Sequence, residues 1–373
     1  MNISMPAAVL RHTAFKICRD YLKGAWNSIT SDTMGWERIT GGLSNFLYKC
    51  SLPPSVPTFE GEPKEVLIRI YGQIHGETAF ENIIVETAIF TLLSERKLGP
   101  KLYGIFPGGR VEEFIPAPSL NTKELKIPSI SRQIAQHLAR VHCLDVPISR
   151  KPVWMWDTMD RWVRKIEQDV SLSASHGVPA DIIQKIRDGA IRRELDWLKT
   201  ELRNVRSPVV FAHNDLQEGN ILVQTEMNNN EKRNEPTRVA IIDFEYCAYN
   251  YRGFDLANHF CEWTYDYKAK DPKHPYFLEI PENWPNNEQQ SLFFESYLSS
   301  IAKEGGALYT GEKWTKDFLF REVDVFTLGP HFFWFLWAMV NAPRSEIEFG
   351  YGDYAACRLK AYYEKKHALG FQT

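Results

Sequence analysis

Apolar residues alternate with polar ones, or recur at helical spacing, in three stretches of the first third of the chain. Residues 64–72 alternate, which predicts a strand in which Arg69 shares a face with apolar neighbours. Residues 79–97 carry apolar side chains at helical spacing and end at a Gly-Pro pair, which predicts a helix with Glu86 on its buried side. A second strand is expected at 110–115, and the Pro-Ala-Pro sequence after it is typical of a hinge.

After this hinge the pattern is mostly helical. The first helix is expected at 131–142, where apolar residues recur every three or four positions. Short apolar runs predict strands at 209–211, 221–223 and 239–242. No internal repeat is present. Strands therefore concentrate before the hinge and helices after it.

The composition is that of an ordinary globular protein. Of the 373 residues, 44% are hydrophobic and 24% are charged, which excludes disordered, fibrous and disulfide-stapled classes. The 44 basic and 47 acidic residues give a net charge of −3, and the sequence has neither a basic run nor zinc-ligand spacing. We therefore expect no nucleic-acid partner.

Cysteine usage and apolar run lengths indicate the compartment. None of the 6 cysteines forms a C-x-x-C pair, which fits a reducing environment. The apolar stretch near the N-terminus is too short for a signal peptide. The longest apolar run covers residues 332–340, whereas a membrane span needs about 18 to 20 residues. We expect a cytoplasmic enzyme without a membrane span.

The strongest chemical signal is a pair of motifs in the second half of the chain. The sequence His-Asn-Asp-Leu-Gln-Glu-Gly-Asn places Asp215 five residues before Asn220, and Ile-Asp-Phe-Glu-Tyr brings Asp243 after a further 23 residues. Phosphoryl transfer needs a carboxylate near the attacking hydroxyl and oxygen ligands for the magnesium on the nucleotide. The order H-x-D-x-x-x-x-N, then D-F, is that of kinases.

This order makes Asp215 the base or hydroxyl-orienting group, and Asn220 and Asp243 the metal ligands. Aspartate and asparagine are also common loop formers, and either motif alone would arise by chance in many proteins. Their order, their spacing and their apolar flanks together favour the catalytic interpretation.

Two upstream features fit the same chemistry. The sequence Gly41-Gly42-Leu-Ser44-Asn45 would let backbone amides approach a phosphate, although taken alone it favours a simple turn between strands. Arg69 would grip phosphate and Glu86 would position it, as a lysine and a glutamate do in protein kinases. The alternative for this pair is a surface arginine and a solvated glutamate.

A third group lies in the predicted helix at 253–263. Asp255, His259 and Glu262 follow one another at i, i+4 and i+7, so they share one stripe of that helix. Such a triad could hold a transition metal. The acids are better explained by a helix that Asp255 braces against the catalytic loop, with Glu262 facing a substrate.

Aromatic residues concentrate in the last third of the chain, where 30 of the 49 lie after residue 245. Trp334 and Trp337 are three residues apart, and a buried core helix is the default for so apolar a run. Tyrosines and acidic residues nearby favour a binding site instead. Aromatic ring faces attract a quaternary ammonium by cation–π interaction, worth about 0.5 to 2 kcal/mol per ring, and a carboxylate attracts it by its charge. The sequence therefore predicts a positively charged alcohol as substrate.

These residues resemble the choline/ethanolamine kinase family, and its choline kinase branch in particular. The matching sequences are those at 213–222, 242–246, 249–255 and 258–263, together with Gly-Gly-Leu-Ser-Asn, Leu-Gly-Pro-Lys-Leu-Tyr-Gly-Ile-Phe and Ile-Glu-Phe-Gly-Tyr. The likeness runs through nearly the whole chain. One departure from protein kinases is Asp-Phe-Glu in place of Asp-Phe-Gly, which argues against activation-loop control of the protein-kinase kind.

The resemblance implies an α+β, bilobal, protein-kinase-like fold. Residues 1–115 would form a small N-terminal nucleotide-binding lobe with an antiparallel sheet and one helix. Residues 116–373 would form a larger, mostly helical catalytic and substrate-binding lobe. The family's activity would transfer the γ-phosphate of ATP, with Mg²⁺, to choline, and more slowly to ethanolamine, as the first step of phosphatidylcholine synthesis. A cytoplasmic homodimer is expected.

The resemblance also assigns roles by position. Asp215 would be the catalytic base, Asn220 and Asp243 the magnesium ligands, and Arg69 a phosphate contact paired with Glu86. Adenine would lie against the backbone of Glu113 and Ile115. The role of Gln217, beside the base, is left open. The choline pocket would be formed by Tyr246, Glu262, Tyr267, Trp334, Trp337 and Tyr354.

Two alternatives stay open at the level of sequence. The first is a related phosphotransferase of the same architecture that prefers ethanolamine or an aminoglycoside antibiotic. The second is a catalytically inactive module that binds choline or a nucleotide. The intact set of Asp215, Asn220 and Asp243 argues against the second.

Overall fold

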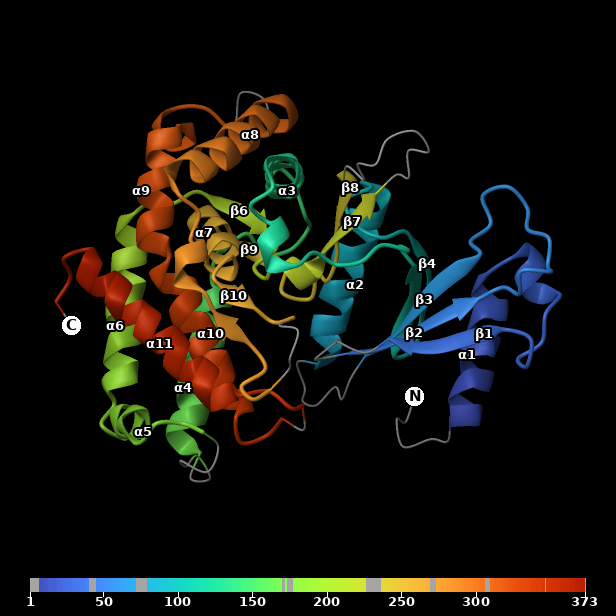
Figure 1. Ribbon diagram of the computed structural model, residues 1–373, viewed down its shortest axis with the longest axis horizontal. Helices are drawn as coiled ribbons and strands as arrows, with labels where there is room; N and C mark the ends of the chain where they lie inside the picture. The colour runs from blue at the N-terminus through green and yellow to red at the C-terminus, as the bar shows by residue number, and fades with distance from the viewer. Residues whose placement is uncertain are drawn as a thin grey trace. The chain divides into compact units, whose positions relative to one another are not determined.

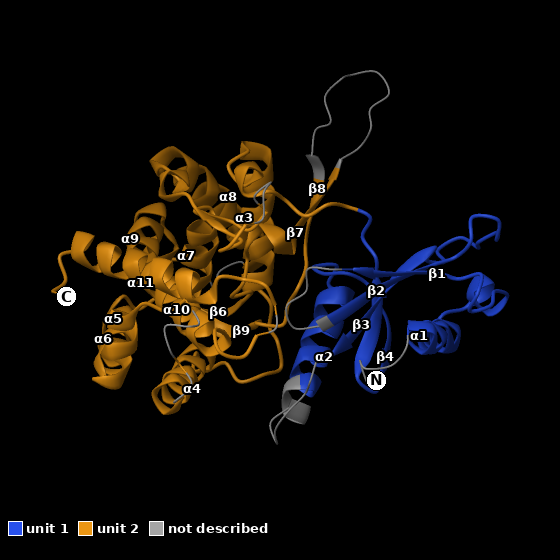
Figure 2. Ribbon diagram, turned by 60° about the horizontal axis from the view of Figure 1, so that its bottom comes forward, with its two compact units in different colours: residues 1–116 blue, residues 117–373 orange. Residues whose placement is uncertain are grey.

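The protein is described by a computed structural model that covers residues 7–39, 45–71, 79–169, 172, 177–225, 236–268, 273–305, 309–345 and 347–372. The chain forms two compact units, residues 1–116 and 117–373, which Figure 2 colours separately. The lobe boundary expected between residues 115 and 116 lies one residue before this division, which falls within the Pro-Ala-Pro sequence at 116–118.

Unit 1 is built on a five-stranded antiparallel sheet (Figure 1). In spatial order the strands are β1 (Gly35–Ile39), β2 (Asn45–Ser51), β3 (Glu65–Tyr71), β5 (Gly109–Glu113) and β4 (Leu102–Phe106). The strands predicted at 64–72 and 110–115 are β3 and β5, and the predicted helix is α2 (Ala79–Glu95).

The central strand β3 is buried on both faces. Val66, Ile68 and Ile70 enter the apolar core of unit 1. Arg69, on the other face, is only 5% exposed. The alternative of a surface arginine at this position is therefore wrong.

Unit 1 has a helix that the sequence pattern did not predict. Helix α1 (Ala7–Tyr21) precedes the sheet, so the expectation of a single helix in this lobe is corrected to two α-helices among the described residues. Leu10, Ala14 and Cys18 recur at four-residue spacing on its buried side. The same periodicity is present in the sequence, but few apolar residues carry it, so the pattern alone does not indicate a helix.

Unit 2 is mostly helical, as the sequence indicates. Its described α-helices are α3 (Pro128–His142), α4 (Trp154–Gln168), α5 (Ala180–Arg187), α6 (Ala190–Asn204), α7 (Arg252–Glu262), α8 (Asn287–Gly305), α9 (Lys316–Phe326), α10 (Leu328–Asn341) and α11 (Tyr351–Ala368). The short strands are β6 (Val209–Ala212), β7 (Ile221–Thr225), β8 (Pro236–Ile241), β9 (Ala248–Tyr251), β10 (Tyr265–Asp266) and β11 (Leu278–Glu279).

Two strand pairs bring distant parts of the sequence together. Strand β6 pairs with β9, and β7 pairs with β8, all antiparallel. The chain therefore passes twice between the β6–β9 pair and the β7–β8 pair, first through residues 213–220 and then through residues 242–247. These two connections carry the candidate catalytic residues, and the pairing places them side by side. The sequence predicted β6, β7 and β8 but neither β9 nor the pairing.

Helix α10 is the buried centre of unit 2. It packs against α4, α7 and α11 (Figure 1). Among the described residues, one helical stretch, Lys316–Asn341, is long and apolar enough by length and composition to cross a membrane, but 83% of its most apolar window is buried inside the protein. This burial is what a core helix requires, and it favours the default interpretation of the apolar run.

Candidate active site

The first catalytic connection, residues 213–220, holds Asp215 and Asn220 in contact. The Nδ2 group of Asn220 donates to the carboxylate of Asp215 at 3.0 Å and to its backbone carbonyl at 2.8 Å. Asn220 closes a short 3-10 turn directly before β7, so the strand fixes its position. The five-residue spacing in the sequence thus becomes a direct side-chain contact.

His213 links this connection to the one that carries Asp243. Its Nδ1 accepts from the backbone N–H of Asp215 at 3.2 Å, so the ring hydrogen is on Nε2, which donates to the carbonyl of Ile242 at 3.1 Å. Burial lowers the pKa of His213, so the ring is neutral. Ile242 directly precedes Asp243, and its amide donates to the Asn220 carbonyl at 3.0 Å. These bonds hold Asp215, Asn220 and Asp243 in adjacent loops.

The backbone at this point is held in an unusual conformation. Asp243 has φ = 64° and Asn214 has φ = 67°, the left-handed region that residues with a Cβ rarely adopt. Asn214 is fixed there by its side chain, which donates to the Tyr246 carbonyl at 2.9 Å and accepts from Asn250 at 2.8 Å. Such strain persists only where the surroundings impose it, and it is common at functional sites.

Helix α7 braces the catalytic connection through Asp255, as predicted. This carboxylate is fully buried and accepts from the amides of His213 and Asn214 at 2.8 and 2.7 Å, and from Nε2 of His142 at 2.9 Å. Burial alone would raise the pKa of Asp255, but these hydrogen bonds outweigh it and lower the pKa. Asp255 therefore acts as a buried anion that fixes the loop.

His259, one turn further along α7, holds the same loop. Its Nε2 accepts from the indole of Trp263 at 3.3 Å, so its Nδ1 donates to the carbonyl of Leu216 at 3.0 Å. Burial lowers the pKa of His259 to about 4, so the ring is neutral. The transition-metal alternative for this stripe is wrong: both histidine nitrogens are used, and no group of three His, Cys, Asp or Glu side chains within the described ranges could hold a metal ion.

Negative charge accumulates around Asp215. The pKa of this carboxyl is raised well above its ordinary value, first by burial and then by the charges of Glu262, Asp243 and Glu245. An excess of anions in one place is stabilised by a cation. Asn220 uses its Nδ2 on Asp215, which leaves the oxygen of the same amide for a metal. The amide oxygen of Asn220 and the carboxylate of Asp243, from adjacent loops, are oxygen donors of the kind that suits Mg²⁺.

In unit 1 the acid–base cluster differs from the expected pair. Glu86 forms a salt bridge with Arg110 at 2.7 Å, and Arg110 also contacts Glu112 at 2.7 Å. Arg69 contacts Glu112 at 3.4 Å. Glu112 thus lies between two guanidinium groups on neighbouring strands. The sequence interpretation missed Arg110 and Glu112, although both lie in the predicted strand 110–115.

The remaining nucleotide-binding predictions fall partly outside the described residues. Gly41, Gly42 and Ser44 lie there, and only the backbone of Asn45, the first residue of β2, is described. Glu113 ends β5, and its amide donates to the carbonyl of Lys101 at 2.8 Å. Ile115 lies in the segment after β5 and is half-buried.

Five of the six predicted choline-pocket residues form one continuous cluster, which we call the ring cluster. Its ring centroids are 5.8 Å apart for Tyr246–Trp334, 5.6 Å for Trp334–Trp337, 6.4 Å for Trp337–Tyr354 and 6.1 Å for Tyr354–Tyr267. Residues from four separate segments therefore meet, although Tyr246 and Tyr354 are far apart in sequence.

The ring cluster is half-buried and adjoins the catalytic residues. Tyr246, Tyr267 and Trp337 are partly exposed, whereas Trp334 is 6% and Tyr354 3% exposed. Burial raises the pKa of Tyr246, and the charges of Glu245 and Asp215 raise it further. Tyr246 is also tied to the catalytic connection, because Asn214, the neighbour of Asp215, donates to its carbonyl at 2.9 Å.

Glu262, the sixth predicted residue, has a partner that the sequence did not reveal. It is 2% exposed and forms a salt bridge with Arg358 of α11, and it accepts from the hydroxyl of Tyr267 at 2.9 Å. The expectation of a carboxylate facing the substrate alone is therefore corrected to a buried ion pair behind the ring cluster. Gln217 also gains a role, because its side-chain oxygen accepts from the amide of Gly219 at 2.9 Å and caps the turn before Asn220.

Comparisons with known proteins identify the family. The family model for choline/ethanolamine kinase matches residues 36–363. The chain is 40% identical to choline kinase alpha of Mus musculus, over 98% of this chain and 83% of that protein. It is 41% identical to choline/ethanolamine kinase of Homo sapiens, over 95% of this chain and 86% of that protein.

Solved structures confirm the predicted fold class. The choline kinase from Cryptosporidium parvum superposes with a TM-score of 0.75 at 29% identity, covering 96% of this chain and 95% of that one. An ethanolamine kinase from Plasmodium vivax shares the fold with a TM-score of 0.72 at 21% identity, covering 98% and 93%. With a sheet-based N-terminal unit, a helical C-terminal unit and a family match over most of its length, the chain belongs to the choline/ethanolamine kinase family.

Proposed function

We propose that this protein is a choline kinase, which transfers the γ-phosphate of ATP to the hydroxyl of choline and yields phosphocholine, the first step of phosphatidylcholine synthesis. Ethanolamine is a slower substrate. Relatives covering nearly the whole chain carry the names choline kinase and choline/ethanolamine kinase. The observation that carries the proposal is the contact of Asp215 with Asn220 next to the ring cluster.

Asp215 orients the attacking hydroxyl and takes its proton. Asn220 holds the carboxylate by a hydrogen bond at 3.0 Å, and the amides bound by Asp255 fix the loop behind it. A loop fixed in this way positions the carboxylate without reorganisation during the reaction, which is where much of the catalysis of phosphoryl transfer arises.

Asn220 and Asp243 are the residues that would hold Mg²⁺. When bound, the ion neutralises charge on the phosphate oxygens of the nucleotide. The residues proposed to bind the nucleotide itself are in unit 1: Gly41, Gly42, Ser44, Asn45, Arg69 with its acid–base cluster, and the backbone of Glu113 and Ile115.

The ring cluster binds the trimethylammonium group. Each ring face attracts a cation by about 0.5 to 2 kcal/mol, and the methyl groups add apolar contact that a primary ammonium lacks. This difference predicts the preference for choline over ethanolamine. We also propose that the protein is a cytoplasmic homodimer, which sedimentation analysis and cell fractionation would test.

The direct test of substrate class is ATP turnover with a panel of amino alcohols. We expect the highest kcat/KM for choline, a lower value for ethanolamine, and none for an aminoglycoside. Preference for ethanolamine would assign the protein to an ethanolamine kinase, and preference for the aminoglycoside would refute the substrate. A lack of any alcohol-dependent release of ADP would favour a catalytically inactive binding module.

Asp243→Ala is expected to raise the Mg²⁺ concentration needed for half-maximal activity by at least about tenfold. Loss of an outer-shell partner typically lowers metal affinity or activity by about 10- to 100-fold, and loss of a direct metal ligand should lower it by no less. Turnover measured across a magnesium titration gives the value. The control is Asp266→Asn, which removes another half-buried acid of unit 2. An unchanged titration for Asp243→Ala would contradict its role as a ligand.

Trp337→Ala is expected to raise KM for choline by about tenfold and to leave KM for ATP within about twofold, because the variant removes one cation–π face. Steady-state kinetics with each substrate varied in turn provides both constants. Trp197→Ala is the matched control, since Trp197 packs against Phe371 with ring centroids 5.1 Å apart and is not part of the ring cluster. Equal losses for both substrates would indicate a packing defect instead.

A further inference from the structure

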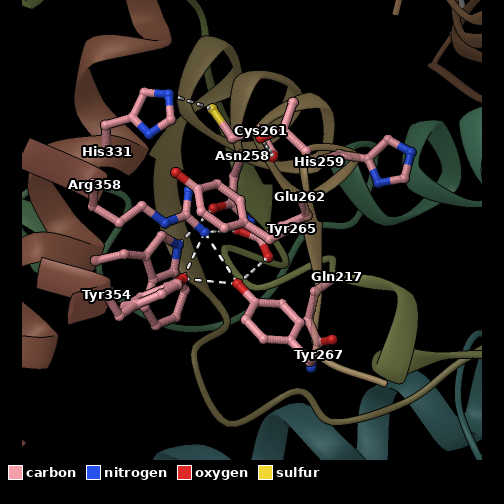
Figure 3. Close-up of polar contacts among 12 residues, drawn as sticks. Gln217, Asn258, His259, Cys261, Glu262, Tyr265, Tyr267, His331, Tyr354 and Arg358 are labelled. Carbon is pink, nitrogen blue, oxygen red and sulfur yellow. Dashed lines mark hydrogen bonds and ion pairs between the residues drawn. The ribbon is translucent and has the colours of Figure 1, made fainter. Parts of the chain in front are cut away.

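Arg358 of α11 is the centre of a buried polar network behind the ring cluster. Its Nη2 donates to the carboxylate of Glu262, to the hydroxyl of Tyr354 at 2.6 Å and to that of Tyr267 at 3.2 Å. Figure 3 shows these four side chains converging, with the guanidinium in the middle. Arg358 is fully buried and is 96 residues from Glu262 in the sequence.

The direction of every hydrogen bond in this network is determined. The hydroxyl of Tyr267 donates its only hydrogen to Glu262, so in its 2.8 Å contact with Tyr354 it is the acceptor. The hydroxyl of Tyr354 in turn accepts from Arg358. Burial raises the pKa of both tyrosines, so both hydroxyls keep their hydrogens. All donation therefore runs from Arg358 towards Glu262.

Arg358 remains charged in this position. Burial opposes its charge, but Glu262 together with Tyr354, Tyr265 and Tyr267 outweighs burial and raises the pKa of the guanidinium. Its plane lies over the ring of Tyr265 at 3.7 Å and near that of Tyr354 at 4.9 Å. Within the described part of the chain, its Nε and Nη1 have no hydrogen-bond partner. The guanidinium is thus held by rings and by one nitrogen that serves three oxygens.

This network leaves few oxygens available to a substrate. Each carboxylate oxygen of Glu262 already accepts a hydrogen bond, its charge is paired, and the hydroxyl oxygens of Tyr267 and Tyr354 both accept from Arg358. A quaternary ammonium has no N–H groups and needs only ring faces and a general excess of negative charge. A primary ammonium brings three N–H donors, and each one left without an acceptor in a buried site is costly.

We propose that Arg358 is a specificity-determining residue, which favours quaternary over primary ammonium substrates by occupying Glu262 and the hydroxyls of Tyr267 and Tyr354. The inference rests on the proposed function and deepens it. Arg358 does not touch the reacting atoms. It acts by occupying hydrogen-bond acceptors that an ammonium substrate would otherwise use.

Arg358→Met tests this directly, because it keeps the length of the side chain and removes its charge and donors. The ratio of kcat/KM for choline to that for ethanolamine is expected to fall at least about tenfold, mainly through a lower KM for ethanolamine, because the freed carboxylate accepts from the ammonium. Calorimetric Kd values for both alcohols give the same comparison independently of turnover. KM for ATP should not change.

A second variant separates charge from packing. Glu262→Gln combined with Arg358→Met removes both charges, so no free carboxylate attracts the primary ammonium, and the preference should return to within about threefold of wild type. The matched control is Lys366→Met, which removes another buried cation of α11, one that is bound to Glu194 at 2.6 Å. It should leave the preference unchanged.

Two results would overturn the inference: a wild-type preference in folded Arg358→Met, or an equal loss in the single and double variants. If Arg358→Met does not fold, Arg358→Lys decides. It keeps the charge but loses the Nη2 position, so the preference should fall at least about threefold, and an unchanged preference would overturn the inference. Wild-type protein that phosphorylates neither alcohol would defeat the proposed function, whereas the ratio of Kd values would still test Arg358.

Discussion

Asp215→Asn is expected to lower kcat by at least about 100-fold, the lower end of what a positioned general base contributes. The substitution keeps the shape of the side chain and its oxygen for Asn220, which donates to Asp215 at 3.0 Å. What it removes is the negative charge that accepts a proton. KM for ATP should stay near its wild-type value, because Asp215 is not among the residues proposed to hold the nucleotide.

Steady-state kinetics with a coupled ADP assay measures this effect. The control is Asp196→Asn on α6, whose side chain is 62% exposed and contacts only Lys199 among the ion pairs of the described residues. It should behave as wild type. Turnover of Asp215→Asn within a few-fold of wild type would show that Asp215 takes no part in the reaction. It would also contradict the catalytic assignment of the loop at 213–220.

Asp255→Ala is expected to destabilise unit 2 by about 3 to 5 kcal/mol and to reduce kcat as well. The variant leaves the amides of His213 and Asn214 and the ring of His142 as buried donors without an acceptor, at about 1 to 3 kcal/mol each. Urea unfolding gives the free energy, and kinetics of the folded fraction gives kcat. A loss below about 1 kcal/mol would show that the brace is not needed.

The pH dependence of this effect follows from the pKa. Because the pKa of Asp255 is lowered in the folded state, its contribution to stability is complete above the ordinary pKa of an aspartate and is lost as the pH falls through the lower, folded value. The difference in unfolding free energy between wild type and Asp255→Ala should therefore shrink as the pH drops below about 4. A difference that grows at acid pH would contradict the assignment of a buried anion.

The sequence predicted those parts of the site in which partners are close along the chain. Asp215 and Asn220 share one short connection, so their spacing implied their contact. Trp334 and Trp337 are three residues apart on one helix, so their shared face followed from helical geometry. Asp255 could be assigned as a brace because it shares one stripe of the predicted helix at 253–263 with Glu262.

The sequence failed where contacts join distant segments. Arg358 is 96 residues from Glu262, and a lone arginine in a helix gives no sign of its partner. Buried arginines are also rare, so the default for Arg69, Arg110 and Arg358 is a solvated side chain. Strand β9 was missed because its alternation is short, and only its pairing with β6 defines it.

The most direct test of the account is to follow the phosphorus of ATP by ³¹P NMR in the presence of Mg²⁺ and choline. A phosphomonoester signal should grow in step with ADP, and no such signal should form when Asp215→Asn replaces the wild type over the same period. Conversion of ATP to inorganic phosphate alone, or no change in ATP, would contradict a phosphoryl-transfer centre that faces the ring cluster.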